Sequence, residues 1–299
     1  MTIQGNTQLW TFGSPFTIRF SITATGTPTP TMADFYIYNL DEKVRNDIAL
    51  DAFGAPDNYN PLLRQITMIA GYNNFAGGQV SPPIIAPVFA GNVFWAYTYR
   101  QGPDWITQIH CADGLGAIDV ADIHQGINGG PNGIQLGQIY RVLCQALKGL
   151  NRDISGYFVS LSFDSIVVSD PVNLVGNPWQ ILIDEVLPRN AHLFIQQGVI
   201  YVLLQNEYVS NPSGVQEINA DSGLIGTPRR QQGLTIADMV FEPRLSVGQS
   251  VTLRSVTGLD GTKLMSLRHY GEISEAECGD CITQATFLRV PNLVLAEAA

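Results

Sequence analysis

A short pattern that occurs twice constrains the fold of this chain more than any other feature. Residues 104–111 read DWITQIHC and residues 280–287 read DCITQATF, so both segments carry D-x-I-T-Q. Each reads as the second arm of a β-hairpin that ends its region of the chain. A five-residue match can arise by chance, but the shared position among the strands favours duplication. The chain is therefore predicted to contain two related β-modules.

The first region, residues 16–111, has the period-two pattern of strands. FTIRFSIT places its Phe and Ile residues on one face, and TMADFYIYNL and LRQITMIAGY continue the pattern, the latter closed by Gly71. A helix is expected in DEKVRNDIALDAF, with Asp41 as its cap. VFWAYTYRQGPDWITQIHCAD reads as a hairpin whose turn is QGPD. Such closely spaced strands predict a sandwich or a barrel.

The middle of the chain, residues 112–205, has a different pattern. IQLGQIYRVLCQALKGL carries apolar residues at helical spacing, and NPWQILIDEVL reads as a helix capped by Asn177. AHLFIQQGVIYVLL reads as two strands joined at QQG. The glycine-rich HQGINGGPNG lacks the Lys-Ser/Thr of a phosphate-binding loop, so we interpret it as a linker leading into a helix. This part is predicted to be a small α/β insertion.

The last region, residues 206–299, returns to strands. MVFEPRLSVGQSVTLRSV has the form strand, turn, strand, and GTKLMSLRHYGEIS with DCITQATFLRV forms a closing hairpin. The predicted fold class is mainly β with an α+β insertion. The predicted domains are a β-module over 1–111, an α/β region over 112–205 and a second β-module over 206–299.

Charge and apolar runs exclude several classes of protein. The chain carries 16 basic and 26 acidic residues, a net charge of −10, which argues against a nucleic-acid grip and an anionic membrane surface. No apolar run reaches the length of a spanning helix, and MTIQGNTQLW lacks a secretory signal. Charged residues make up only 14%, which favours a surface covered by partner proteins.

The four cysteines pose a separate question. Cys278 and Cys281 form a C-x-x-C, whereas Cys111 and Cys144 stand apart. A zinc site would need a second spaced pair of ligands, and a thioredoxin-like site would need a following helix. No metal and no cofactor are expected. The remaining interpretation is a pair of thiols in a hairpin. Three alternatives stay open: the thiols close a small ring, one bonds across a subunit boundary, or both stay reduced. Our hypothesis is a disulfide that involves at least one of Cys278 and Cys281.

Signals of enzymatic chemistry are weak. The sequence has neither G-x-S-x-G nor H-E-x-x-H, and its histidines are scattered (His110, His124, His192 and His269). Asp184 and Glu185 are adjacent on a helix, about 100° apart, which is a poor arrangement for a glycosidase pair. We predict that the chain is not an enzyme, although a carboxylate pair from distant parts of the chain stays open.

The aromatic clusters and the arginine pair can each be assigned two different roles. FYIY and VFWAYTY could stack on bases or sugars, and alternating strand positions favour core and interface instead. TPRRQQG holds Arg229 and Arg230, which we interpret as a solvated loop or a salt bridge to a partner.

Several segments, in order, resemble baseplate hub proteins of contractile-tailed bacteriophages. They are MADFYIYNLDEKVRNDI, ITMIAGY and DWITQIHCADG, then SGLIGTPRRQQGLTIADMVFEPRLSVGQSVTLRS and RHYGEIS. The resemblance covers residues 30–115 and 220–290. Members of that family often have an aromatic residue where this chain has Cys281.

The resemblance implies a homotrimer in which each subunit supplies two tube-like β-barrel modules. Six such modules would join the sixfold tail tube to the threefold central spike and line a channel through which DNA passes. The implied partners are the tail tube protein, the central spike protein, the tape measure protein and other baseplate proteins. DNA would be a partner only in transit, with no membrane insertion, and the location would be the virion baseplate, assembled in the host cytoplasm. Two alternatives stay open: a hexameric tail tube or tube-initiator protein, and a hub-carried cell-wall glycan hydrolase or glycan-binding protein.

Overall fold

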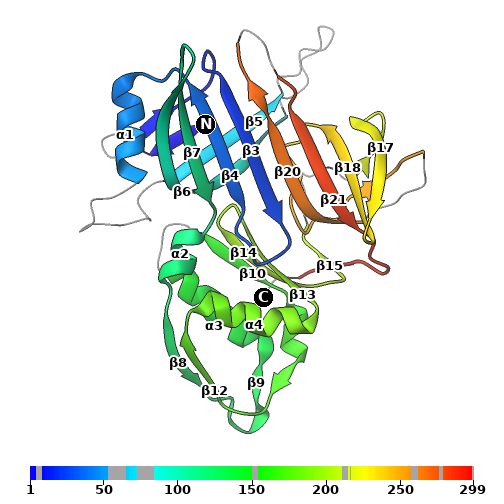
Figure 1. Cartoon of the computed structure of the whole chain (residues 1–299). Coiled ribbons are helices and arrows are strands. Elements are labelled where there is room, and N and C mark those ends of the chain that lie inside the picture. Colours follow the sequence, from blue (N-terminus) through cyan, green and yellow to red (C-terminus); the bar gives the residue numbers. More distant parts are fainter. Residues whose placement is uncertain are drawn as a thin grey trace.

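A large antiparallel sheet dominates the molecule (Figure 1). The computed structural model describes residues 1–4, 9–52, 65–72, 84–149, 154–210, 215, 217–256, 262–275 and 279–297. In chain order the strands of the sheet are β1 (Thr2–Gln4), β2 (Leu9–Thr11), β3 (Ile18–Thr25), β4 (Met32–Tyr38), β5 (Gln65–Tyr72), β6 (Ile84–Gln101), β7 (Asp104–Ala112), β17 (Leu224–Gln231), β18 (Leu234–Val240), β20 (Lys263–Ile273) and β21 (Ile282–Leu288). They lie in the order β17-β18-β21-β20-β3-β4-β7-β6-β5-β1-β2.

The insertion between β7 and β17 holds three of the four α-helices in the described part of the chain (Figure 1). A sheet in the order β10-β14-β13 packs with helices α3 and α4. The elements are α2 (Leu115–Val120), β8 (Ile123–Ile127), η2 (Gly130–Asn132), β9 (Ile134–Gln135), α3 (Leu136–Gly149), β10 (Gly156–Val159), η3 (Leu161–Ser165), β11 (Val167–Val168), β12 (Val172–Gly176), α4 (Pro178–Val186), η4 (Leu187–Arg189), β13 (Ala191–Gln196) and β14 (Val199–Leu204).

The remaining elements are one helix and four short strands. Helix α1 (Glu42–Ala52) follows β4, and the short strands form two parallel pairs, β15 with β22 and β16 with β19. Their bounds are β15 (Glu207–Tyr208), β16 (Glu217–Ile218), β19 (Thr252–Leu253) and β22 (Val294–Leu295). The predicted class, mainly β with an α/β insertion, is therefore confirmed.

Two four-stranded blocks of the large sheet have the same internal order. We call β3-β4-β7-β6 the first block and β17-β18-β21-β20 the second block. In each block the D-x-I-T-Q strand, β7 or β21, lies between the second and fourth strands, which agrees with the predicted duplication. The blocks join side by side where β20 pairs with β3, from Ser266 opposite Thr25 to Ile273 opposite Ile18.

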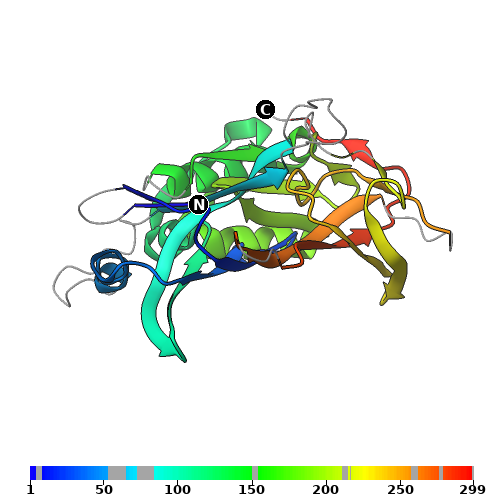
Figure 2. The same ribbon diagram turned by 90° about the horizontal axis from the view of Figure 1, so that it is seen from above.

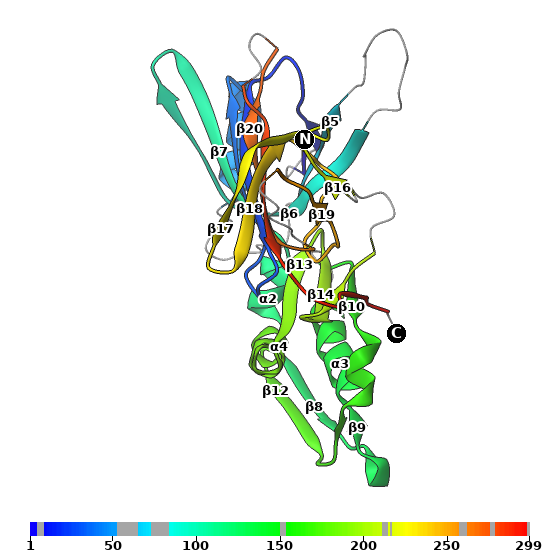
Figure 3. The same cartoon turned by 90° about the vertical axis from the view of Figure 1, so that its right-hand side faces the viewer.

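The sheet is open and curved, not a pair of barrels. In the described part of the chain β17 and β2 end the strand order, so the expected barrels do not close within one chain. Seen from above, the β6–β7 and β17–β18 ends bend to the same side (Figure 2). Figure 3, turned about the vertical axis, shows the insertion extending beyond the sheet along the strand direction. We call the side toward which both ends bend the concave face.

Three apolar cores hold these parts together. The first lies behind the first block, around Phe20, Phe35 and Phe89, and the second lies in the insertion. The third packs behind the second block and includes Phe194 and Leu203 of the insertion. The division into 1–111, 112–205 and 206–299 stays a prediction.

Local signals in the sequence explain most element boundaries. The Asp41 carboxylate accepts from the Lys43 amide at 2.9 Å, and the Asn177 side chain accepts from the amides of Trp179 and Gln180. Strand β5, however, does not close at Gly71 but runs on to Tyr72. A Cβ at Gly71 would lie 1.8 Å from the Ile84 carbonyl oxygen, so the glycine permits close pairing with β6 rather than ending the strand.

Close packing explains the need for glycine in the HQGINGGPNG segment. It begins within β8, passes through η2 and leads by β9 into α3, as a linker should. Gly133 has φ +73°, and a Cβ there would lie 2.5 Å from Val167 Cγ1 on β11. The glycines of this segment therefore allow a close approach of backbone to a neighbouring strand.

Candidate functional site

The candidate site is a surface. Among the described residues, no group of three or more His, Cys, Asp or Glu side chains is placed to hold a metal ion. No helix in the described ranges is long and apolar enough to cross a membrane. The features that stand out are the concave face of the large sheet, the joint between its blocks and its two ends.

A row of aromatic side chains follows β6 on the concave face. Trp95, Tyr97 and Tyr99 share that face because they are two residues apart. The Trp95 and Tyr97 ring centroids are 5.2 Å apart, and those of Tyr97 and Tyr99 are 5.6 Å apart. Tyr97 is 44% exposed. These rings of VFWAYTY are thus available to a partner, whereas Phe35 of FYIY belongs to the core.

His110 continues the aromatic row onto β7. Its ring stacks on Trp95 with centroids 5.0 Å apart, and its Nδ1 lies 2.7 Å from Asp34 Oδ1 on β4. The carboxylate orients the imidazole, and the imidazole in turn orients the indole. His110 thus links Asp34 of β4 to the aromatic row of β6.

The glutamine of D-x-I-T-Q makes equivalent contacts in the two blocks. Gln108 donates to the Tyr36 hydroxyl at 3.1 Å, and Gln284 donates to Asp238 Oδ1 at 2.7 Å. In both cases the acceptor lies directly opposite on the neighbouring strand. The repeated glutamine thus makes the same cross-strand hydrogen bond in both blocks, which strengthens the evidence for duplication.

The threonine of the pattern also has matching partners. The Thr107 hydroxyl lies 3.2 Å from that of Thr98 on β6, and the Thr283 hydroxyl lies 2.8 Å from His269 Nδ1 on β20. Both threonines are buried, and each partner is the residue opposite on the fourth strand of its block. The pattern therefore marks two corresponding places in space.

An ion pair crosses the joint between the blocks. Arg19 of β3 donates through Nε and Nη2 to Glu272 Oε2 of β20, at 3.0 and 2.7 Å. This hydrogen bond raises the pKa of Arg19. The Arg19 side chain is 56% exposed, so the pair contributes less than about 1 kcal/mol. Arg19 and Glu272 lie opposite each other in the ladder of β3 and β20, so the pair agrees with the register of the joint.

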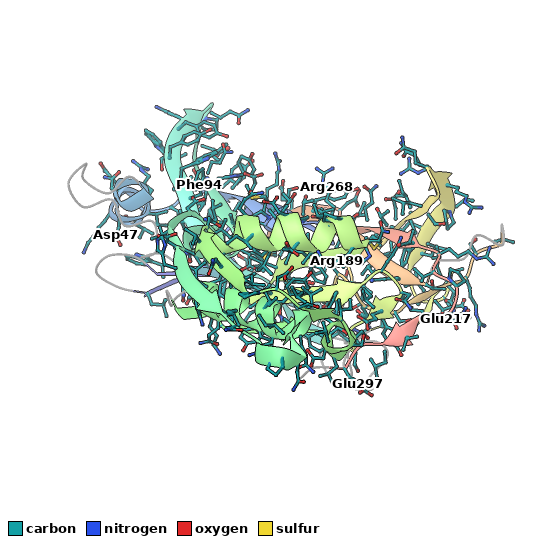
Figure 4. All side chains as sticks on the ribbon, turned by 90° about the horizontal axis from the view of Figure 1, so that it is seen from below. Asp47, Phe94, Arg189, Glu217, Arg268 and Glu297 are labelled. Atoms are coloured by element: carbon teal, nitrogen blue, oxygen red, sulfur yellow. The ribbon has the colours of Figure 1, made fainter. Side chains whose placement is uncertain are left out.

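The two neighbouring arginines do not lie in a loop. Arg229 and Arg230 belong to β17, the strand at one end of the sheet, and Arg229 Nη2 lies 3.4 Å from Asp238 Oδ2. The turn residues of TPRRQQG led the sequence prediction to place them outside a strand. In the view from below, Arg268 of β20 lies between the two curved ends (Figure 4). Its guanidinium stacks on the Tyr270 ring at 5.1 Å.

The C-x-x-C hairpin is only partly described. Cys278 lies outside the described residues. Cys281 lies near the turn before β21, with its Sγ 3.7 Å from the Glu272 carbonyl oxygen, beside a groove that Tyr72 and Phe241 also line. Trp105, its counterpart, stacks under Arg45 of α1 at 4.1 Å. The proposed disulfide stays a prediction, which titration of two reduced thiols in intact particles would contradict.

The other candidates for chemistry have local partners. His124 is exposed and pairs with Asp122 at 2.9 Å, while Asp184 accepts from Gln180 of its own helix. Glu185 pairs with Arg189 at 2.8 Å. These carboxylates stabilise α4 and its end, as charged residues on helix surfaces commonly do.

A buried polar cluster connects the insertion to the second block, and the sequence did not reveal it. Glu207 accepts from the hydroxyls of Ser160 and Ser162 and from the Leu204 amide. Lys263 Nζ donates to the carbonyls of Leu204 and Gln205, and burial lowers the pKa of Lys263 to about 8. Single charged residues in polar surroundings give no periodic signal, so only the structure brings them together.

Solved structures of other proteins share the fold of this chain. No family model and no curated protein matches the sequence. The 43 kDa tail protein of prophage MuSo2 from Shewanella oneidensis superimposes with a TM-score of 0.56 at 10% identity, over 96% of this chain and 97% of that one. The tail protein of Neisseria meningitidis MC58 gives 0.55 at 9% identity, over 98% of both chains. This chain has the fold of phage tail proteins.

A third solved structure, from a secretion system, shares the fold. A component of the E. coli type VI secretion system, described as structurally similar to tail proteins of bacteriophage T4, gives a TM-score of 0.52 at 8% identity. The match covers all of this chain and 79% of that one. The resemblance to hub proteins is therefore confirmed at the level of the tail-protein fold, which contains both blocks and the insertion together.

Proposed function

We propose that this chain is a structural virion protein of a phage tail and acts as its baseplate hub. Three copies would present six similar blocks, which would join the sixfold tail tube to the threefold central spike. The observation that carries this proposal is the shared order of the two blocks, because one chain then supplies two equivalent units to a ring. The tail-protein fold of the neighbouring structures supports it.

The concave face gives the proposed hub its lining. In the ring, this face would surround the channel, with the tail tube protein at one end and the central spike at the other. Tape measure and other baseplate proteins would contact the remaining surfaces. Arg19 and Arg229 have carboxylate partners, Glu272 and Asp238, which lowers the attraction of the lining for DNA in transit.

Two other functions fit less well. A hexameric tube or tube-initiator protein needs only one block per chain, whereas this chain has two. A hub-carried glycan hydrolase needs two carboxylates directed at one site, and the adjacent Asp184 and Glu185 instead contact residues of α4 and its end. The proposal is therefore non-enzymatic, with a location in the virion tail baseplate.

The mass and symmetry of the assembled protein test the proposal. We expect native mass spectrometry to give a trimer, and electron microscopy to give a threefold ring with pseudo-sixfold features. A sixfold ring of six chains would favour the tube protein. A stable monomer that cleaves cell-wall glycan would contradict the hub.

A further inference from the structure

The joint inside the chain shows how one block pairs with the next. There β20, the fourth strand of the second block, pairs antiparallel with β3, the first strand of the first block. Tyr270 lies directly opposite Ser21 in this joint. Because the two blocks have the same strand order, the same kind of joint can form again wherever a fourth strand meets a first strand.

Each block has one such strand whose outer edge is not fully paired with another strand in the described part of the chain. The fourth strand of the first block is β6, which pairs with β5 only as far as Asn92 and with β7 from there to Gln101. Within the described chain, the far side of Trp95–Gln101 has no strand partner. The first strand of the second block is β17, which ends the sheet.

The repeated pattern identifies which residue of β6 corresponds to Tyr270. Tyr270 lies opposite Ile282 of β21, and Tyr99 lies opposite Ile106 of β7. Ile282 and Ile106 are both the third residue of D-x-I-T-Q. Tyr99 is therefore the counterpart of Tyr270, and both are tyrosines.

The same procedure identifies the counterpart of Ser21. From His110 on β7, two steps across the sheet lead to Ser21 on β3. From Thr286 on β21, which has the same position relative to D-x-I-T-Q, two steps lead to Arg229 on β17. Arg229 therefore has the place in the second block that Ser21 has in the first.

We propose that β6 of one copy pairs antiparallel with β17 of a second copy, with Tyr99 opposite Arg229 of the second copy. This inference rests on the proposed function as an oligomeric hub and deepens it by naming the strands and the register of the subunit joint. The interface is head-to-tail, since two different edges meet, and such interfaces close into rings when the rotation allows.

The chemistry of the two edges suits this pairing. The Arg229 side chain is 65% exposed and would face a tyrosine, a favourable cross-strand pair for a guanidinium. Within β20, Arg268 already stacks on the Tyr270 ring of the same strand. Phe94 beside one edge and Ile225 at the other are large apolar side chains that a joint would cover.

The shape of β17 limits the length of the joint. A bulge between Ile225 and Arg229 contains Pro228, which has no amide hydrogen to donate. The regular ladder therefore covers Arg229–Gln231 and is shorter than the internal joint. A short joint with a bulge beside it allows pairing with one correct partner and disfavours continuous edge-to-edge aggregation. Both ends of the sheet bend to the same side, as a closed ring requires (Figure 2).

Disulfide trapping tests the register in the full-length chain. The test variant is Tyr99→Cys with Arg229→Cys, oxidised and separated without reductant. The matched control is Ser21→Cys with Tyr270→Cys, the same places in the internal joint, which should close within one chain. A shifted variant, Tyr97→Cys with Arg229→Cys, moves one partner by two residues, beyond the usual disulfide span. The unmodified chain controls for its native cysteines.

The expected result is loss of the monomer band and gain of covalent dimers and larger rings in the test variant alone. If copies associate but the test variant forms no cross-link, while the internal control forms its disulfide, the proposed strand joint is contradicted. The proposed hub function is not affected by that result. A chain that stays monomeric at every concentration would overturn both. Covalent rings of a number other than three would support the joint and contradict the threefold hub.

Discussion

At the scale of single residues, stability depends on a few buried groups in close contact with neighbours. His192 and His269 are largely buried imidazoles, and burial lowers the pKa of each to about 4. Gly137 permits a carboxylate to lie against a helix. Each of these residues would look ordinary in the sequence, because burial and contact with distant residues have no local pattern.

The two histidines should make the fold sensitive to acid. Their ordinary pKa is 6.5, so between pH 6.5 and pH 4 the unfolded chain binds more protons than the folded one. We expect the free energy of unfolding to fall as the pH drops through that window, by roughly 3 kcal/mol for each histidine at about 1.4 kcal/mol per pKa unit. Urea titrations across this pH range measure the slope.

Two variants distinguish the contribution of the buried histidines to this pH dependence from that of the carboxylates. His269→Gln removes one buried titrating group and should reduce the slope. His124→Gln, which removes an imidazole that is 69% exposed, is the matched control. Equal slopes in the two variants would contradict the burial argument.

Gly137 is expected to resist substitution. A Cβ there would lie 2.0 Å from Asp164 Oδ1, and the Asp164 carboxylate is held by Arg141 at 2.8 Å. Gly137→Ala should therefore destabilise the fold by about 1–3 kcal/mol, the usual cost of overpacking. Thermal unfolding measures the effect.

The same helix offers a control for this prediction. A Cβ at Gly149 meets nothing within 4 Å, so Gly149→Ala should be neutral or mildly stabilising. Removing the carboxylate, in Gly137→Ala with Asp164→Ala, should recover part of the loss. A neutral Gly137→Ala would show that the contact is not restrictive.

At the scale of elements, the sequence predicted strands, hairpins and helices well because their signals are local. Period-two alternation gave β3 and β4, helical spacing gave α3, and Asn177 gave the start of α4. The joint of β20 with β3 was not predicted, since Arg19 and Glu272 are 253 residues apart and strand period carries no information on distant partners. The concave aromatic row was ambiguous for a related reason, because alternation does not say which face is covered.

The insertion is expected to fold when produced alone as residues 112–205. Every buried residue of its core lies between Ala117 and Val202, so the segment holds a complete apolar centre. Phe194 and Leu203 pack into the neighbouring core and would become exposed, so Phe194→Ser with Leu203→Ser should keep it soluble. Cooperative loss of helical circular dichroism on heating is the expected result. A non-cooperative transition would contradict the predicted domain boundaries.

At the scale of the whole molecule, charge and shape act together. The net charge is −10, and Arg19 and Arg229 each lie beside a carboxylate, Glu272 and Asp238. The two blocks share one continuous sheet, whereas the insertion forms a separate three-stranded sheet of its own. A net negative charge of this size is expected to repel a polyanion such as DNA.

The chain should therefore bind duplex DNA weakly or not at all. We expect no measurable shift in fluorescence anisotropy with a labelled duplex at about 0.15 M salt, where a basic groove of several phosphate contacts would bind. Arg19 and Arg229 can be released from their partners by Glu272→Gln with Asp238→Asn. That variant should gain weak, salt-sensitive binding, and tight binding by the unmodified chain would contradict the argument.

The central joint also sets a timetable for synthesis. Strand β3 is complete by Thr25, but its partner β20 begins only at Lys263, near the other end of the chain. At about 5–20 residues per second, a ribosome needs roughly 10 to 50 s to make the intervening segment. During that interval the edge of β3 lacks its partner and is open to other strands, so nascent chains are exposed to edge-to-edge aggregation. Slow translation or a crowded polysome would therefore reduce the yield of folded subunits well before any assembly begins.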